Sequence, residues 1–109
     1  MEIKAFIETL VFTRLIEEID DRSLLKKIQD EILKDPTKSD VIPGAGGVRK
    51  IRVGKNGSGK RGGYRVLYLD LVERRTIVLL TIYDKRVKDN ITEEQKRTIR
   101  ILAQKLKGE

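Results

Sequence analysis

Residues 48–85 read VRKIRVGKNGSGKRGGYRVLYLDLVERRTIVLLTIYDK. Within them, residues 48–53, 64–71 and 76–83 are rich in Val, Ile, Leu, Tyr and Thr, and turn-like residues separate the three segments. This pattern is typical of β-strands. The connecting sequences GKNGSGKRGG and ERR are too short for a crossover helix, so we expect the three strands to form an antiparallel meander.

The flanking sequence predicts one further strand and three helices. Residues 2–7 largely alternate apolar and polar side chains, as in a short strand. Apolar residues at helical spacing predict helices over about 9–20 and 23–34, and the short link between them indicates an antiparallel helical hairpin. Thr92 and Gln95 fit a capping box that opens a last helix.

The predicted elements make one α+β domain over residues 1–109. Their order is β-α-α-β-β-β-α, with a loop over 35–47. We expect an antiparallel sheet that packs against the helical hairpin and the C-terminal helix. A chain of 109 residues is long enough for an ordinary hydrophobic core in a single domain.

Positive charge is concentrated in residues 41–69. This stretch contains seven Lys and Arg residues, no Asp or Glu, and eight of the nine glycines. The rest of the chain is neutral, so the formal net charge of +7 is a local feature. A focused positive field attracts polyanions, and a phosphate backbone is the expected ligand.

The composition excludes several kinds of catalytic and metal site. The chain has no Cys and no His, so disulfides, thiolate nucleophiles, Ser-His systems and zinc fingers are ruled out. Catalysis would have to use Lys, Arg, Tyr, Asp or Glu, and we expect no cofactor and no metal. The longest apolar stretch, around 77–82, is too short to span a membrane, so we expect a cytoplasmic protein with no membrane partner.

The glycine-rich connection between the first two meander strands allows three interpretations. Gly54 to Lys60 matches the G-x-x-x-x-G-K spacing of a phosphate-binding loop, but Arg61 stands where Ser or Thr is needed and a strand follows in place of a helix. The other two interpretations are a solvated hairpin tip and a mobile basic loop that closes over nucleic acid, with Lys55, Lys60 and Arg61 as its contacts.

Strand alternation separates the basic residues of the first meander strand. Arg49 shares a face with the apolar residues Ile51 and Val53, whereas Lys50 and Arg52 lie on the opposite face. Two adjacent cations on one face repel each other, which a sheet tolerates more readily where an anion lies between them. Arg65 on the neighbouring strand extends this patch if the register allows.

Two further groups of side chains have a structural and a functional interpretation. Tyr64 and Tyr68 share one face of their strand and serve either packing or base stacking. Tyr83, Lys85 and Arg86 end the last strand. They form either a charged exit turn or a second source of positive charge for a ligand.

The order of these motifs resembles the RelE/ParE toxin superfamily. R-K-I-R at 49–52 is followed by the Gly/Lys hairpin, by G-Y-R-V-L-Y at 63–68 and by L-L-T-I-Y-D-K at 79–85. The resemblance covers nearly the whole chain, and its specific part runs from Gly44 to Lys85. It is closest to HigB-type toxins of type II toxin–antitoxin modules and implies a RelE-like fold.

The resemblance implies a ribosome-dependent mRNA endoribonuclease. In that family the toxin enters the ribosomal A site and cleaves mRNA without a metal. The 2′-hydroxyl of the RNA is the nucleophile, and the product carries a 2′,3′-cyclic phosphate. The implied partners are the ribosome, mRNA and a cognate antitoxin, HigA-like and carrying a helix-turn-helix domain.

The resemblance also implies roles for individual residues. Lys50 and Arg52 are similar to the paired basic residues of the family's catalytic strand. Arg65 is similar to the arginine that clamps the scissile phosphate. Lys85 or Arg86 is similar to the cation near the leaving group.

The general base is not assigned by the resemblance. Some members use a late His or a late Tyr, and this chain has no His and no Tyr after Tyr83. Tyr83 lies close to where some members place a further catalytic side chain. Crowded cations favour the neutral form of a lysine, which would allow Lys50 or Lys85 to act as a base.

Two other functions remain compatible with the sequence. A ParE-like inhibitor of DNA gyrase has the same fold but does not need the basic cluster. A non-catalytic RNA- or DNA-binding protein would bind with a log–log salt slope of about −4 to −6 if it contacts six or so phosphates, and it would cleave nothing.

Overall fold

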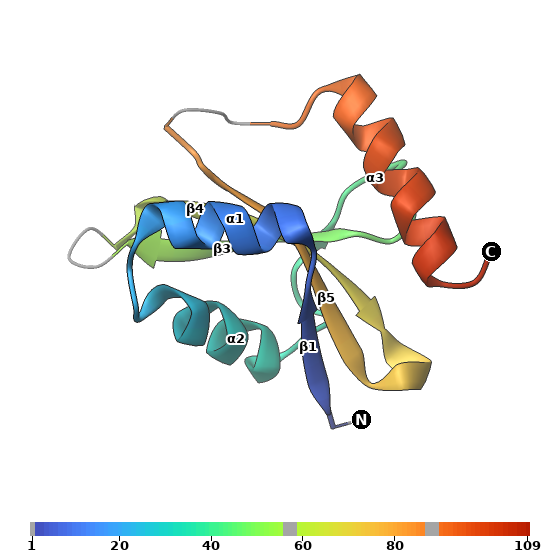
Figure 1. Cartoon of the computed structure of the whole chain (residues 1–109), viewed down its shortest axis with the longest axis horizontal. Helices are drawn as coiled ribbons and strands as arrows, with labels where there is room; N and C mark the ends of the chain where they lie inside the picture. Colours follow the sequence, from blue (N-terminus) through green and yellow to red (C-terminus); the bar gives the residue numbers. More distant parts are fainter. Residues whose placement is uncertain (1, 56–58, 87–89) are drawn as a thin grey trace.

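The computed structural model describes residues 2–55, 59–86 and 90–109, and the side chains of residue 55 and residues 59–62 lie outside this description. Figure 1 shows a mixed sheet with helices on both of its faces. The elements in chain order are β1 (Ala5–Glu8), α1 (Leu10–Ile19), α2 (Leu24–Lys34), β2 (Asp40–Val41), β3 (Arg49–Lys55), β4 (Gly59–Leu71), the 3₁₀ turn η1 (Val72–Arg74), β5 (Thr76–Asp84) and α3 (Glu93–Leu106).

The predicted antiparallel meander is confirmed, and one detail of the sheet differs from the expectation. The sheet has the order β1-β5-β4-β3-β2, in which β3, β4 and β5 pair antiparallel. The first strand pairs parallel with β5, so the sheet is mixed. A parallel pair requires a long connection, and the chain between β1 and β5, which includes both helices of the hairpin, supplies it.

The prediction of an uninterrupted loop over 35–47 is wrong, because β2 lies within it. Asp40 pairs with Lys50 and Val41 with Arg49 in an antiparallel arrangement. The Ile42 N–H continues the pairing with a 2.9 Å hydrogen bond to the Val48 carbonyl. A strand of two residues is too short to show an alternating pattern, so strand β2 left no periodic signal in the sequence.

The sheet has a separate hydrophobic core on each face. The antiparallel hairpin of α1 and α2 covers one face, and α3 lies on the other side (Figure 1). Fully burying a side chain such as Phe or Leu contributes about 1.5–3 kcal/mol to the stability of the folded state. The hairpin core includes Phe12, Leu24, Ile28, Ile32, Val66, Tyr68 and Leu79. The α3 core includes Ala45, Val48, Leu67, Leu69, Leu80 and Ala103.

Threonine residues cap the starts of the first and last helices. The Thr9 hydroxyl accepts a 3.0 Å hydrogen bond from the Phe12 N–H at the start of α1. At the start of α3, Thr92 and Gln95 form the predicted reciprocal capping box. None of the helices in the described part of the chain has both the length and the apolar character needed to cross a bilayer.

Of the two interpretations for Tyr68, the structure supports packing. Its ring is fully buried in the hairpin core, and its hydroxyl donates a 2.8 Å hydrogen bond to the Pro36 carbonyl. Burial raises the pKa of the Tyr68 hydroxyl, so the proton stays available for this bond. Tyr64 is half-buried and packs against the same core.

We expect Tyr68→Phe to lower the free energy of unfolding by about 1 kcal/mol, because the Pro36 carbonyl loses its donor while the ring still fills the core. Urea denaturation of the two proteins measures the difference. An unchanged or higher stability of the variant would show that the bond does not hold the segment after α2 to the core.

Candidate functional site

A cavity of about 680 Å³ opens between α2, the segment that follows it, and strands β3 and β4. No described residue of α3 lines this cavity. Its described cations come from four separate parts of the chain, which the fold brings together. They are Lys34, Lys38, Lys50, Arg52, Arg65 and Lys85. We refer to this space as the cationic cavity.

The register of β3 and β4 decides which basic residues meet. Arg52 pairs directly with Arg65, and side chains at directly opposed positions point to the same face with Cβ atoms about 5 Å apart. Lys50 lies two residues before Arg52 and therefore shares this face. The Arg65 side chain is only 3% exposed, so the core fixes its position.

Arg49 points to the opposite face, as strand alternation predicts. One of its guanidinium nitrogens, Nη1, donates hydrogen bonds of 2.9 Å to the Thr37 carbonyl and 2.6 Å to the Ser39 carbonyl. Arg49 therefore holds the segment between α2 and β2 against the sheet, and it does not line the cationic cavity.

The structure brings together four of the six predicted catalytic residues: Lys50, Arg52, Arg65 and Lys85. Neither Lys50 nor Arg52 makes a side-chain hydrogen bond or ion pair with any residue that the structure describes. The end of β5 is tied to β4 by a 3.3 Å hydrogen bond from the Lys85 N–H to the Gly63 carbonyl, which places Lys85 at the cavity.

Arg86 and Tyr83 do not line the cationic cavity. Arg86 forms a 3.4 Å ion pair with Asp84, and its side chain is 71% exposed. Tyr83 pairs with Arg65 in the β4–β5 register but borders a neighbouring cavity. The predicted ribosome contacts at Lys55, Lys60 and Arg61 fall outside the side chains that the structure describes.

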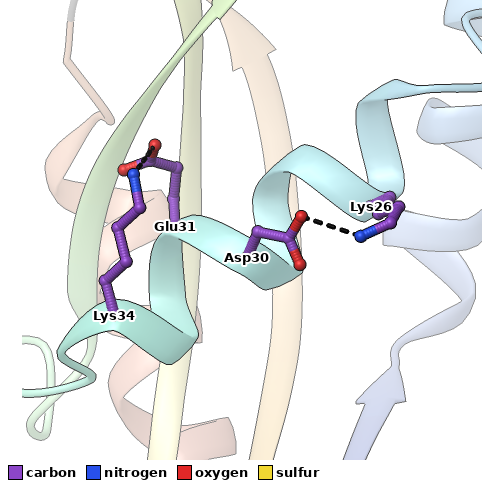
Figure 2. A network of polar contacts seen from close by, with 4 residues as sticks. All are labelled: Lys26, Asp30, Glu31 and Lys34. Atoms are coloured by element: carbon purple, nitrogen blue, oxygen red, sulfur yellow. Dashed lines mark hydrogen bonds and ion pairs between the residues drawn. The ribbon is translucent and has the colours of Figure 1, made fainter.

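Carboxylates on the wall of the cationic cavity were not anticipated from the sequence. Figure 2 shows Glu31 beside Lys34 at the end of α2, where their side chains form a 2.9 Å ion pair. The Asp35 carboxylate accepts hydrogen bonds from the Thr37 hydroxyl at 2.8 Å and the Thr37 N–H at 3.0 Å. These bonds, the hydroxyl first, lower the pKa of Asp35.

Asp40 is the third carboxylate on this wall, and it also lines a second cavity of about 650 Å³. The second cavity shares Asp40 and Lys50 with the first and extends toward Tyr83 and the start of α3. The sequence carries only a weak sign of β2. Asp40 precedes the apolar pair Val41-Ile42, a Pro-Gly turn follows, and the basic strand β3 comes next. Within the described part of the chain, no three carboxylates are grouped to hold a metal ion.

Comparison with known families identifies the chain. The family described as the RelE toxin of the RelE/RelB toxin–antitoxin system matches residues 6–109. The chain belongs to the RelE toxin family. This membership agrees with the motif order from the basic strand to the end of β5.

Solved structures of E. coli RelE show the same fold. A double mutant of the toxin in the free state has a TM-score of 0.62 at 14% identity, with 94% of this chain and 97% of that chain covered. The isolated toxin has a TM-score of 0.58 at 16% identity, with 89% and 96% covered. The intact RelBE toxin–antitoxin complex has a TM-score of 0.56 at 18% identity, with 71% and 90% covered.

We expect Lys50→Met to reduce the salt dependence of binding to a short single-stranded RNA. The slope of log affinity against log salt should become shallower by about 0.7, the contribution of one phosphate contact to a single strand. Fluorescence anisotropy over a series of KCl concentrations measures the slope.

Lys26→Met is the matched control for this charge change. Lys26 lies on the exposed side of α2, where it pairs with Asp30 at 3.0 Å (Figure 2), and it lines neither cavity. Its removal should leave the slope unchanged. Equal changes of the slope in the two variants would show that RNA binding depends on net charge alone and that RNA does not enter the cationic cavity.

Proposed function

We propose that this RelE-family chain is the toxin of a type II module and an endoribonuclease that cleaves mRNA in the ribosomal A site. The observation that carries the proposal is the convergence of Arg52, Arg65, Lys50 and Lys85 on one cavity. Like charges at directly opposed sheet positions are destabilising, and a phosphate bound between them relieves the repulsion.

The chemistry suits these residue types. Attack of a 2′-oxygen on the adjacent phosphorus produces a phosphorane with two negative charges. Positive groups that are already in position stabilise that charge more than they stabilise the ground state. Arginine stays charged and presents a planar fork to phosphate oxygens. The proposed reaction uses no metal and no cofactor.

The burial and position of each residue suggest its role in the proposed reaction. The buried Arg65 is the fixed clamp on the scissile phosphate, and Arg52 and Lys50 extend the clamp along β3. Lys85, at the end of β5, is the cation near the leaving group. Tyr83 borders the adjoining cavity, and we propose that it contacts a neighbouring nucleoside.

The ribosome and an antitoxin complete the proposal. The ribosome would hold mRNA in the in-line conformation, which supplies much of the rate enhancement and makes free RNA a poor substrate. The glycine-rich tip with Lys55, Lys60 and Arg61 would contact ribosomal RNA. E. coli RelE is known in a complex with its antitoxin, which supports a cognate antitoxin for this chain. We propose that this antitoxin is HigA-like with a helix-turn-helix domain and that the toxin acts in the cytoplasm.

We expect Arg65→Ala to lower the rate of mRNA cleavage on programmed ribosomes by about 10²-fold or more, the scale for removing one charge-stabilising donor. Because Arg65 is buried, Arg52→Ala provides a second variant whose exposed side chain can be removed without disturbing the core. It should lose cleavage in the same direction.

Arg97→Ala is the control, since Arg97 is exposed on α3 and lines neither cavity. Its cleavage rate should equal that of the wild type. Wild-type rates in both Arg65→Ala and Arg52→Ala would overturn the site. A wild-type protein that leaves mRNA intact but blocks supercoiling by gyrase would support the ParE-like alternative.

We expect Lys85→Ala to lose more cleavage activity than Arg86→Ala. Lys85 lines the cationic cavity, whereas Arg86 turns to Asp84. The same ribosome assay ranks the two variants. The reverse order would place the leaving group beyond the end of β5, outside the cavity.

A further inference from the structure

We infer that Asp40 accepts the proton of the 2′-hydroxyl in the proposed cleavage. The inference rests on the proposed function and supplies the general base that the family resemblance does not assign. Asp40 lies on β2 directly opposite Lys50 on β3, and both residues line the two adjoining cavities. A carboxylate therefore stands at the edge of the proposed phosphate site.

Asp40 differs from the other carboxylates that line the two cavities, because these others are engaged by neighbouring groups. Four described carboxylates line one cavity or both. Glu31 and Asp35 are held by the ion pair and hydrogen bonds described above, and Glu93 pairs with Lys96 at 3.4 Å. Asp40 makes no side-chain hydrogen bond or ion pair with a residue that the structure describes, so its oxygens can accept a substrate proton.

The backbone on either side of Asp40 is fixed. The Ser39 carbonyl, immediately before it, accepts the 2.6 Å hydrogen bond from Arg49. The Ile42 N–H, two residues after it, donates to the Val48 carbonyl at 2.9 Å. A base on a segment held in this way needs little reorganisation when substrate arrives.

The position of Asp40 fits the geometry of the nucleotide. The 2′-oxygen belongs to the ribose that carries the scissile phosphate, so its base catalyst must lie at the border of the phosphate site. Asp40 and Lys50 line both cavities, so an RNA strand that runs from the cationic cavity into the second one would carry that ribose past Asp40. Opposed Cβ atoms lie about 5 Å apart, and no ion pair joins Asp40 to Lys50, so a hydroxyl and a phosphate oxygen can enter between them.

The proposed step balances without a further reactant. The 2′-hydroxyl proton passes to an Asp40 carboxylate oxygen as the 2′-oxygen forms a bond to phosphorus. The bond between phosphorus and the 5′-oxygen breaks, and Lys85 gives that oxygen a proton. The products are a 2′,3′-cyclic phosphate and a 5′-hydroxyl, and solvent restores both side chains.

Asp40→Asn tests the inference in single-turnover cleavage of mRNA on programmed ribosomes. The cleavage rate should fall by about 10²–10⁴-fold, the usual contribution of a general base, while the affinity for the ribosome is retained. Asp40→Glu keeps a carboxylate and should recover part of the lost rate. Asp30→Asn removes the same charge from the exposed side of α2 (Figure 2) and should cleave as the wild type does.

An mRNA with sulfur in place of the 5′-bridging oxygen separates the base from the acid. Sulfur leaves without a proton, so Lys85→Ala should regain most of its rate on this substrate. Asp40→Asn should keep its full defect, because the 2′-hydroxyl still has to lose its proton. If Asp40 instead protonated the leaving group, Asp40→Asn would regain its rate on this substrate as Lys85→Ala does.

Several results would overturn the inference. Wild-type cleavage by Asp40→Asn, or recovery of Asp40→Asn on the sulfur substrate, would remove Asp40 from the base role while leaving the proposed function intact. A loss of ribosome affinity that accounts for the whole defect, or a lowered thermal midpoint shared by Asp40→Asn and Asp40→Glu, would assign Asp40 to binding or folding. Failure of the wild type to cleave ribosome-bound mRNA would reject the proposed function itself.

Discussion

The antiparallel pairing of β3 with β4 is the constraint on which the remaining structure depends. Alternation along β3 sends Arg49 to the hairpin face and Lys50 and Arg52 to the other face. The register then sets Arg52 opposite Arg65. A slip of one residue would exchange the two faces, bury Lys50 and Arg52 against the hairpin core, and expose the apolar residues of that strand. The hydrophobic core therefore enforces the positions of Lys50, Arg52 and Arg65 in the cavity.

The same pairing organises the segment between α2 and β3. Arg49 reaches from the hairpin face to the Thr37 and Ser39 carbonyls, and Tyr68 on β4 donates to Pro36. Each hydrogen bond contributes only about 1 kcal/mol. Together, however, they fix the path of a stretch that has little regular structure. Side chains on the hairpin face of the sheet thus hold residues 36–39 in place, and Lys38 and Ser39 of this segment line the cationic cavity.

Much of this arrangement is predictable from the sequence, and the features that the sequence does not predict each have a physical reason. The three long strands, the hairpin and the separation of Arg49 from Lys50 follow from periodicity alone. The pairing of Arg52 with Arg65 depends on the register, which the glycine-rich connection does not determine. Asp40 lies on a strand too short to show a pattern. The choice between Lys85 and Arg86 depends on the turn after β5, where adjacent residues face different directions.

The distribution of carboxylates explains how a cation-lined cavity remains open to an external anion. Acidic residues are present on its wall, but the ones nearest α2 are engaged locally, Glu31 by Lys34 and Asp35 by Thr37. Lys50 and Arg52 carry no such partner among the described residues. A carboxylate paired with them would lower their repulsion and also occupy the place that we propose for the substrate phosphate. Under the proposed function, the free protein keeps the repulsion between these cations, and binding of the substrate phosphate would relieve it where the reaction is proposed to take place.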